Sequence, residues 1–126
     1  MLVLDSGGFG RLSERSKRAL ALIEELRTAG FWPPVVPTMV LVESLQGHPG
    51  RYANANRFLK TVFKEESVGI ELARRAAELR RRSRHGSAVD ALVVAVAEPN
   101  GVVLTSDEAD VTALAAVSNG VTVELV

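Results

Sequence analysis

The sequence predicts an α/β fold in which helices flank a parallel β-sheet. Short apolar runs alternate with longer segments of helical periodicity along all 126 residues. Strands that alternate with helices imply a parallel sheet that is covered on both faces. No repeat, linker or low-complexity tract interrupts this pattern, so we expect a single domain over residues 1–126.

The first part of the chain predicts a strand, a turn and a long helix. Leu2–Leu4 is expected to be a buried strand that ends at Asp5. The glycine-rich segment Gly7–Gly10 is expected to form a turn. Residues 13–29 have the apolar spacing of an amphipathic helix, and Gly30 is its stop signal.

The middle of the chain predicts two strands and two helices. Pro33–Pro37 is expected to be a strand, because its prolines lie at the ends, where strands tolerate them. Thr38 is expected to cap a helix that runs to Leu45. Residues 51–59 are expected to be helical, and residues 61–66 are expected to form the third strand.

The last part of the chain predicts three helices and two strands. Residues 67–82 are expected to form an amphipathic helix, and Ser87 is expected to open the next one. Residues 102–104 are expected to be a strand, followed by a helix that Ser106 caps and that runs through Val117. Residues 121–125 are expected to form the final strand.

The composition excludes some kinds of site. Fifteen basic and fifteen acidic side chains give a formal net charge of zero, so any attraction to nucleic acid or membrane must come from a local patch. The chain has no cysteine, which excludes disulfides and thiolate metal sites. No signal peptide and no apolar run of roughly 20 residues is present, so we expect a cytoplasmic protein without membrane contact.

One carboxylate interrupts an apolar segment. Ser87–Ala97 is apolar after the serine except for Asp90, and a charge removed from water costs several kcal/mol unless it is paired. One explanation is local: Ser87 caps the helix, and the helix dipole favours a negative charge at the position of Asp90. The other explanation is that Asp90 belongs to a site shared with other segments.

Three further acidic residues adjoin apolar segments. Asp5 ends the first strand and Asp107 follows the strand 102–104, so both are expected at the carboxyl edge of the sheet, where ligands bind in such folds. Glu43 lies one helical turn after Val40 and is expected to point inward with it. Local alternatives exist for each: a capping role for the two aspartates, and an ion pair with an arginine for Glu43.

The four carboxylates come from four separate segments of the chain. If they converge, their mutual repulsion raises their pKa values or pushes them apart, and a hard divalent cation resolves the conflict. Mg²⁺ and Mn²⁺ prefer oxygen ligands, and such an ion activates a water and stabilises charge on a phosphoryl group. We therefore expect a metal site at Asp5, Glu43, Asp90 and Asp107.

The stretches that carry these residues match a known family in order. LVLDS, MVLVESL, AVDALVVAVA and VVLTSDEADV together resemble a PIN domain, specifically the toxin ribonuclease of a VapBC-type toxin–antitoxin pair. The resemblance covers essentially the whole chain. It implies a PIN-like three-layer fold with about five parallel strands. It also implies Mg²⁺- or Mn²⁺-dependent endonuclease activity on RNA, a homodimer, and a small antitoxin that covers the site.

The resemblance also implies a role for each acidic residue. Asp5, Asp90 and Asp107 would hold the metal directly, and Glu43 would hold it directly or through a water. Water would attack the phosphodiester in line and leave a 5′-phosphate and a 3′-hydroxyl. The segment DSGGFGR departs from the commonest form of the family, in which larger apolar residues follow the first aspartate and its small neighbour.

Three more residues near Asp107 are candidates for supporting roles. By the resemblance, Thr105 and Ser106 are expected to be hydrogen-bond donors beside it. Asp110 falls where some family members place another acidic residue. The alternative for Asp110 is an exposed position on a helix.

A basic cluster precedes the helix of Asp90. Its members are Arg74, Arg75, Arg80, Arg81, Arg82, Arg84 and His85. Arginine pairs with phosphate through a two-point fork, so Arg80, Arg81, Arg82 and Arg84 are candidates for RNA binding. The alternatives are a solvated helix face and contact with an acidic segment of an antitoxin.

Two other functional classes compete with the nuclease. One is a PIN-like binding or regulatory module without catalysis. The other is a small phosphatase or nucleotide-binding domain of Rossmann type. The chain lacks a D-x-D pair after the first strand, a dinucleotide fingerprint and a P-loop lysine, which argues against the latter.

Overall fold

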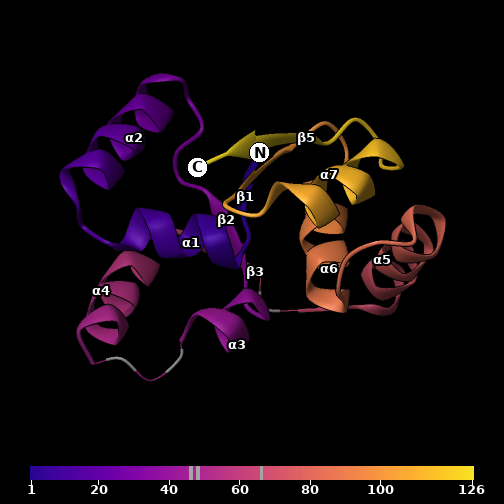
Figure 1. The fold of residues 1–126 in the computed structure, drawn as a ribbon, viewed down its shortest axis with the longest axis horizontal. Coiled ribbons are helices and arrows are strands. Elements are labelled where there is room, and N and C mark those ends of the chain that lie inside the picture. Colours follow the sequence, from indigo (N-terminus) through magenta and orange to yellow (C-terminus); the bar gives the residue numbers. More distant parts are fainter. Residues whose placement is uncertain (46, 48, 66) are drawn as a thin grey trace.

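The protein has the expected α/β architecture, with a five-stranded parallel sheet between layers of helices (Figure 1). The computed structural model describes residues 1–45, 47, 49–65 and 67–126. The strands are β1 (Leu2–Leu4), β2 (Val35–Pro37), β3 (Phe63–Glu65), β4 (Val102–Thr105) and β5 (Thr122–Leu125). All of the pairings are parallel, in the order β3-β2-β1-β4-β5. The carboxyl ends of the strands therefore share one edge of the sheet.

The helices cover both faces of the central strands. They are α1 (Ser6–Ser13), α2 (Lys17–Thr28), α3 (Val40–Ser44), α4 (Pro49–Leu59), α5 (Ile70–Ser83), α6 (Ala88–Ala97) and α7 (Glu108–Ala116). α1 packs on β1 and β4, whereas α6 packs on β1, β2 and β4. Every side chain of β1 is at most 2% exposed, so the first strand is buried on both faces. Within the described residues, none of these helices combines the length and apolarity needed to cross a membrane.

The structure corrects the entry to the first helix. The expected turn Gly7–Gly10 is helical and belongs to α1, and the helix expected over residues 13–29 is present as α2 but begins at Lys17. The cause is a helix cap: Asp5 accepts a hydrogen bond from the Gly8 amide at 2.7 Å. The sequence also suggested that Gly7 and Gly8 permit a close backbone approach, and this part of the expectation is confirmed, although within a helix instead of a turn.

Gly7 and Gly8 bring α1 against the edge of β4. A Cβ on Gly8 would collide with the carbonyl oxygen of Leu104, and one on Gly7 would collide with the hydroxyl of Ser106. A side chain at either position would therefore separate the helix from the strand. This contact explains why the two positions are occupied by glycine.

Other boundaries also differ from the expectations. α5 starts at Ile70 rather than Ser67, and Asp107 rather than Ser106 is the N-cap of α7. Met39 rather than Thr38 is the N-cap of α3. The third strand ends at Glu65, and Glu66 lies outside the described residues.

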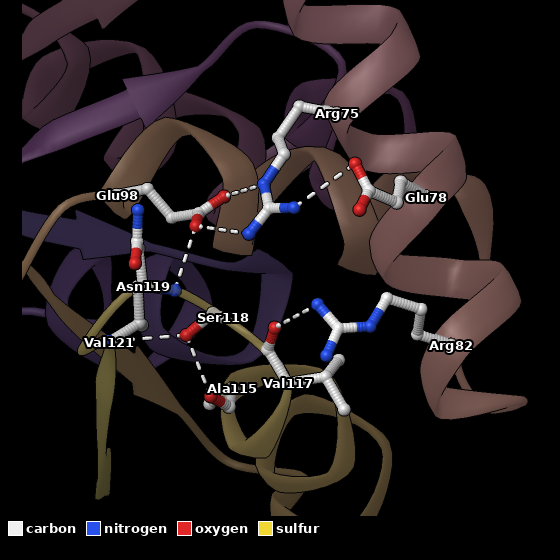
Figure 2. Close-up of polar contacts among 9 residues, drawn as sticks. All are labelled: Arg75, Glu78, Arg82, Glu98, Ala115, Val117, Ser118, Asn119 and Val121. Carbon is white, nitrogen blue, oxygen red and sulfur yellow. Dashed lines mark hydrogen bonds and ion pairs between the residues drawn. The ribbon is translucent and has the colours of Figure 1, made fainter.

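An ion pair fastens three segments at the amino-terminal end of β4 and β5 (Figure 2). Arg75 of α5 donates from Nε and Nη2 to the two carboxylate oxygens of Glu98, each at 2.8 Å. Glu98 also accepts the amide of Asn119 at 2.8 Å, and its side chain is 9% exposed. These hydrogen bonds, chiefly those from Arg75, hold the pKa of Glu98 below its ordinary value. We call this arrangement the Arg75–Glu98 clasp.

We predict that Arg75→Ala lowers the free energy of unfolding by about 1–3 kcal/mol at pH 7, because Glu98 loses its charged partner. The depressed pKa of Glu98 means that this stability is present above the ordinary carboxyl range and disappears as the pH falls through the folded-state pKa. Denaturant unfolding of both proteins at neutral and acidic pH measures the difference. Arg74→Ala, an exposed neighbour, is the control, and an equal loss in both variants would contradict a specific clasp.

Candidate functional site

The four expected acidic residues line a single cavity at the carboxyl edge of the sheet. Its volume is about 350 Å³. Its lining residues are Asp5, Ser6, Gly7, Glu43, Ser87, Asp90, Ser106, Asp107, Asp110 and Val111. These residues come from the ends of β1 and β4 and from α1, α3, α6 and α7. The fold thus gathers carboxylates that are far apart in the sequence.

Asp5 is the most buried of these carboxylates, at 6% exposed. Burial is the main cause that raises the pKa of Asp5, and the negative charge of Asp90 adds to it. Hydrogen bonds from the Gly8 amide and the Thr105 hydroxyl act in the opposite direction but do not cancel the effect. Asp5 therefore combines two tasks, because it caps α1 and presents a desolvated negative charge to the cavity.

Asp90 has both of the roles that the sequence left open. Ser87 and Asp90 form a capping box: the Asp90 amide donates to the Ser87 hydroxyl at 3.1 Å, and the Ser87 amide donates to Asp90 Oδ2 at 2.9 Å. The carboxylate sits in the first turn of α6, before the buried part of the helix, and it lines the acidic cavity. The cap fixes the orientation of the side chain and engages only one of its two oxygens.

Glu43 is placed differently from the expectation. It does not point inward with Val40: Val40 is 0% exposed, whereas Glu43 is exposed at the rim of the cavity. Three residues of helix separate two side chains by about 60° around the axis, which is enough for one to face the core and the other the rim. The Ser6 hydroxyl donates to Glu43 Oε2 at 3.2 Å and orients it.

Thr105 supports the backbone that carries Asp107. Its hydroxyl donates to the Asp107 carbonyl at 2.9 Å and accepts from the Asp107 amide at 3.0 Å. Thr105 is 0% exposed, and its hydroxyl lies close enough to Asp5 to act on the pKa of that carboxyl, so Thr105 sits between the ends of β1 and β4. Ser106 lines the cavity beside Gly7.

Two further residues adjoin the site: Ser6, which the sequence did not single out, and His85, which it placed only in the basic cluster. Ser6 orients Glu43, and its only signal was its position after Asp5. His85 Nδ1 lies 3.5 Å from Asp110 Oδ1, which is an ion pair when the histidine is protonated. Asp110 lines the cavity, so the turn between α5 and α6 reaches its rim.

The four candidate arginines for RNA binding differ in their contacts. Arg80 donates from Nε to the Gly86 carbonyl at 3.1 Å. Arg82 donates to the Val117 carbonyl at 3.4 Å (Figure 2). Both therefore hold α5 to its neighbours. Arg81 and Arg84 are exposed and make no ion pair with the described residues.

The donors around the cavity suit a hard cation in type. Carboxylate and hydroxyl oxygens predominate, and nitrogen and sulfur ligands are not among its lining side chains within the described chain. Over the described residues, however, no group of three or more acidic, histidine or cysteine side chains is arranged to hold a metal ion. Mg²⁺ binds through one or two carboxylates and keeps several waters, and the cavity has room for a hydrated ion. The lining residues thus suit an Mg²⁺ ion that keeps several of its waters, rather than an ion whose ligands all come from the protein.

Comparison with known proteins assigns no family to the chain. No protein-family model matches it, and no curated protein matches its sequence. Its activity is therefore inferred from the side chains around the acidic cavity.

We predict opposite effects for two glycines of α1. Gly8→Ala should lower the free energy of unfolding by about 1–3 kcal/mol, because the new methyl group collides with Leu104. Gly10→Ala should raise it by about 0.5–1 kcal/mol, because a Cβ there meets no atom within 4 Å and alanine favours the helix. Denaturant unfolding checks both variants. Equal effects would show that α1 does not depend on close contact with β4.

We predict that Mg²⁺ stabilises the protein through the acidic cavity. Millimolar Mg²⁺ should raise the melting temperature of the wild type, and Asp5→Asn should reduce that rise. In chelator at neutral pH, Asp5→Asn should melt higher than the wild type, because the amide still accepts from Gly8 but carries no buried charge.

The pH dependence of the same two proteins gives an independent check. Because the folded-state pKa of Asp5 is raised, the wild type in chelator should lose stability as the pH rises from the ordinary carboxyl range through that pKa. Asp5→Asn should lack this loss. Glu71→Gln, in the exposed first turn of α5, is the matched control. A wild-type melting temperature that does not respond to Mg²⁺ would refute the metal site.

Proposed function

We propose that the protein is an Mg²⁺- or Mn²⁺-dependent endoribonuclease and acts as the toxin of a type II toxin–antitoxin pair. The observation that carries the proposal is the convergence of Asp5, Glu43, Asp90 and Asp107 on one cavity. Carboxylates from separate segments gather where a cation offsets their repulsion. The toxin role and the RNA substrate come from the resemblance of the motifs to PIN-domain ribonucleases.

Each acidic residue has a task in this proposal. Asp5, Asp90 and Asp107 would hold the cation, and Glu43 would hold it directly or through a water. When bound, the ion supplies an activated water and stabilises negative charge on the phosphate. The capping box aims Asp90, Ser6 aims Glu43, and Thr105 fixes the backbone at Asp107. Hydrolysis would leave a 5′-phosphate and a 3′-hydroxyl.

Partners and substrate contacts belong to the same proposal. Arg81 and Arg84 are the best placed of the four arginines for RNA, because Arg80 and Arg82 already bind backbone carbonyls. A small antitoxin would cover the acidic cavity, and two copies of the toxin would form a homodimer in the cytoplasm.

One observation favours a second candidate, a PIN-like binding module without catalysis. Among the described residues, no three acidic, histidine or cysteine side chains are arranged to hold one metal ion. A module that only binds RNA or protein needs no such arrangement. Calorimetry with Mn²⁺ separates the two candidates, because the nuclease requires a binding signal at millimolar concentration and the module does not.

We predict that the purified protein cleaves RNA in Mg²⁺ or Mn²⁺ and not in chelator. Asp5→Asn and Asp90→Asn should each reduce the rate by at least about 100-fold, because each removes charge that acts on the reacting phosphate through the metal. Cleavage of a labelled RNA on a gel measures the rate, with Glu71→Gln as the control. Equal cleavage by the wild type and both variants would mean that a contaminant is responsible.

A further inference from the structure

A second cavity adjoins the acidic cavity beside α1. The second cavity has a volume of about 250 Å³ and shares Ser6 with the acidic one. It lies where α1 packs against α3 and α4. Its polar lining includes the side chains of Ser13, Ser44 and Asn54. The residue that orients Glu43 therefore also forms the junction between the two cavities.

A third cavity extends the path in the same direction. It has a volume of about 410 Å³ and shares Ser13 and Asn54 with the second. Most of its lining residues belong to α2, to α4 and to the carboxyl-terminal end of α1, which lies between these two helices (Figure 1). Its rim carries Arg15, Arg27 and Arg57. The three cavities thus follow one another beside α1 and share wall residues, and we call this series of cavities the track.

The chemistry of the lining changes along this track. The first cavity is acidic, the second combines neutral hydrogen-bonding and apolar groups with Glu14, and in the third three arginines outnumber the one carboxylate, Glu24. Arg27 lies over the ring of Trp32 at 5.2 Å from its centroid, which gives the third cavity a flat cationic and aromatic wall. Hydrogen-bonding groups followed by arginines suit a nucleotide followed by a phosphate.

Asn54 occupies the junction of the second and third cavities. Its Oδ1 accepts only a long contact from Arg57 at 3.5 Å, and its side-chain amide donates to none of the described residues. It is half-buried, so its position is held by the helix packing of α4. A carboxamide offers both a donor and an acceptor, which is the combination that reads the edge of an unpaired base.

We propose that single-stranded RNA follows this track, that Asn54 reads the base of the nucleotide next to the cleaved bond, and that Arg15 and Arg57 bind the following phosphate. The inference rests on the proposed nuclease function and adds its determinant of sequence preference. The second cavity lies just below the size range of drug-sized ligand sites, so it suits one nucleoside rather than a folded element. Asn54 is then a specificity residue and not a catalytic one.

The test uses an RNA pool of randomised sequence and sequencing of the cut ends. The wild type should prefer one base at a position beside the cut by about 5- to 150-fold, the range of one good base contact. Asn54→Ala should lose that preference and keep metal-dependent cleavage. Asn56→Ala is the matched control, since Asn56 is exposed on the same helix and lines none of the three cavities in the described structure.

A binding measurement tests the phosphate contacts without requiring cleavage. Arg57→Ala should weaken binding of the same pool, and the slope of log affinity against log salt should fall by about 1. Arg74→Ala, on the exposed face of α5, should leave both quantities unchanged. Fluorescence anisotropy in chelator gives both numbers, and circular dichroism checks that each variant is folded.

The outcomes separate this inference from the proposed function. An unchanged base preference in Asn54→Ala overturns the inference and leaves the nuclease intact, and it is the result expected if the third cavity takes a peptide. A wild type that binds RNA but does not cleave it refutes the nuclease. In that case weaker RNA binding by Arg57→Ala still supports binding along the track, and unchanged binding refutes it. A wild type that neither binds nor cleaves RNA refutes both.

Discussion

The close contact between α1 and the edge of β4 is the constraint on which the site depends. Gly7 and Gly8 allow the helix backbone to approach Leu104 and Ser106, and Asp5 caps the helix that they begin. This contact sets the distance between the ends of β1 and β4, which carry Asp5 and Asp107. Because Ser6 is in the first turn of the same helix, its hydroxyl reaches Glu43 of α3. A larger side chain at either glycine would therefore move several parts of the acidic cavity at once.

The acidic cavity concentrates negative charge that the fold must tolerate. Burial and the charge of Asp90 raise the pKa of Asp5, so the ionised form of this residue opposes folding at neutral pH. Local hydrogen bonds reduce the cost: the capping box satisfies one oxygen of Asp90, and Gly8 satisfies one oxygen of Asp5. These contacts leave other carboxylate oxygens facing the cavity. The same residues thus cap helices and line the acidic cavity.

The sequence was informative where a signal is local and less so where it depends on packing. The order of strands and helices, the Ser87–Asp90 cap and the four acidic positions all followed from spacing and from matched motifs. α1 was missed because glycines favour turns unless a neighbouring backbone demands them, and that neighbour, β4, is about 100 residues away in the chain. The outward position of Glu43 and the place of Asn54 between two cavities depend on how short helices pack, which periodicity does not report.

The Arg75–Glu98 clasp and the acidic cavity lie at opposite ends of the strands. Glu98 precedes β4 and Asp107 follows it, and a four-residue strand spans roughly 13 Å. Sites separated by that distance and sharing no partner contribute independently to the free energy of unfolding. The clasp is thus a stabilising contact at one end of the sheet, and its sequence can change without altering the arrangement of carboxylates at the other end.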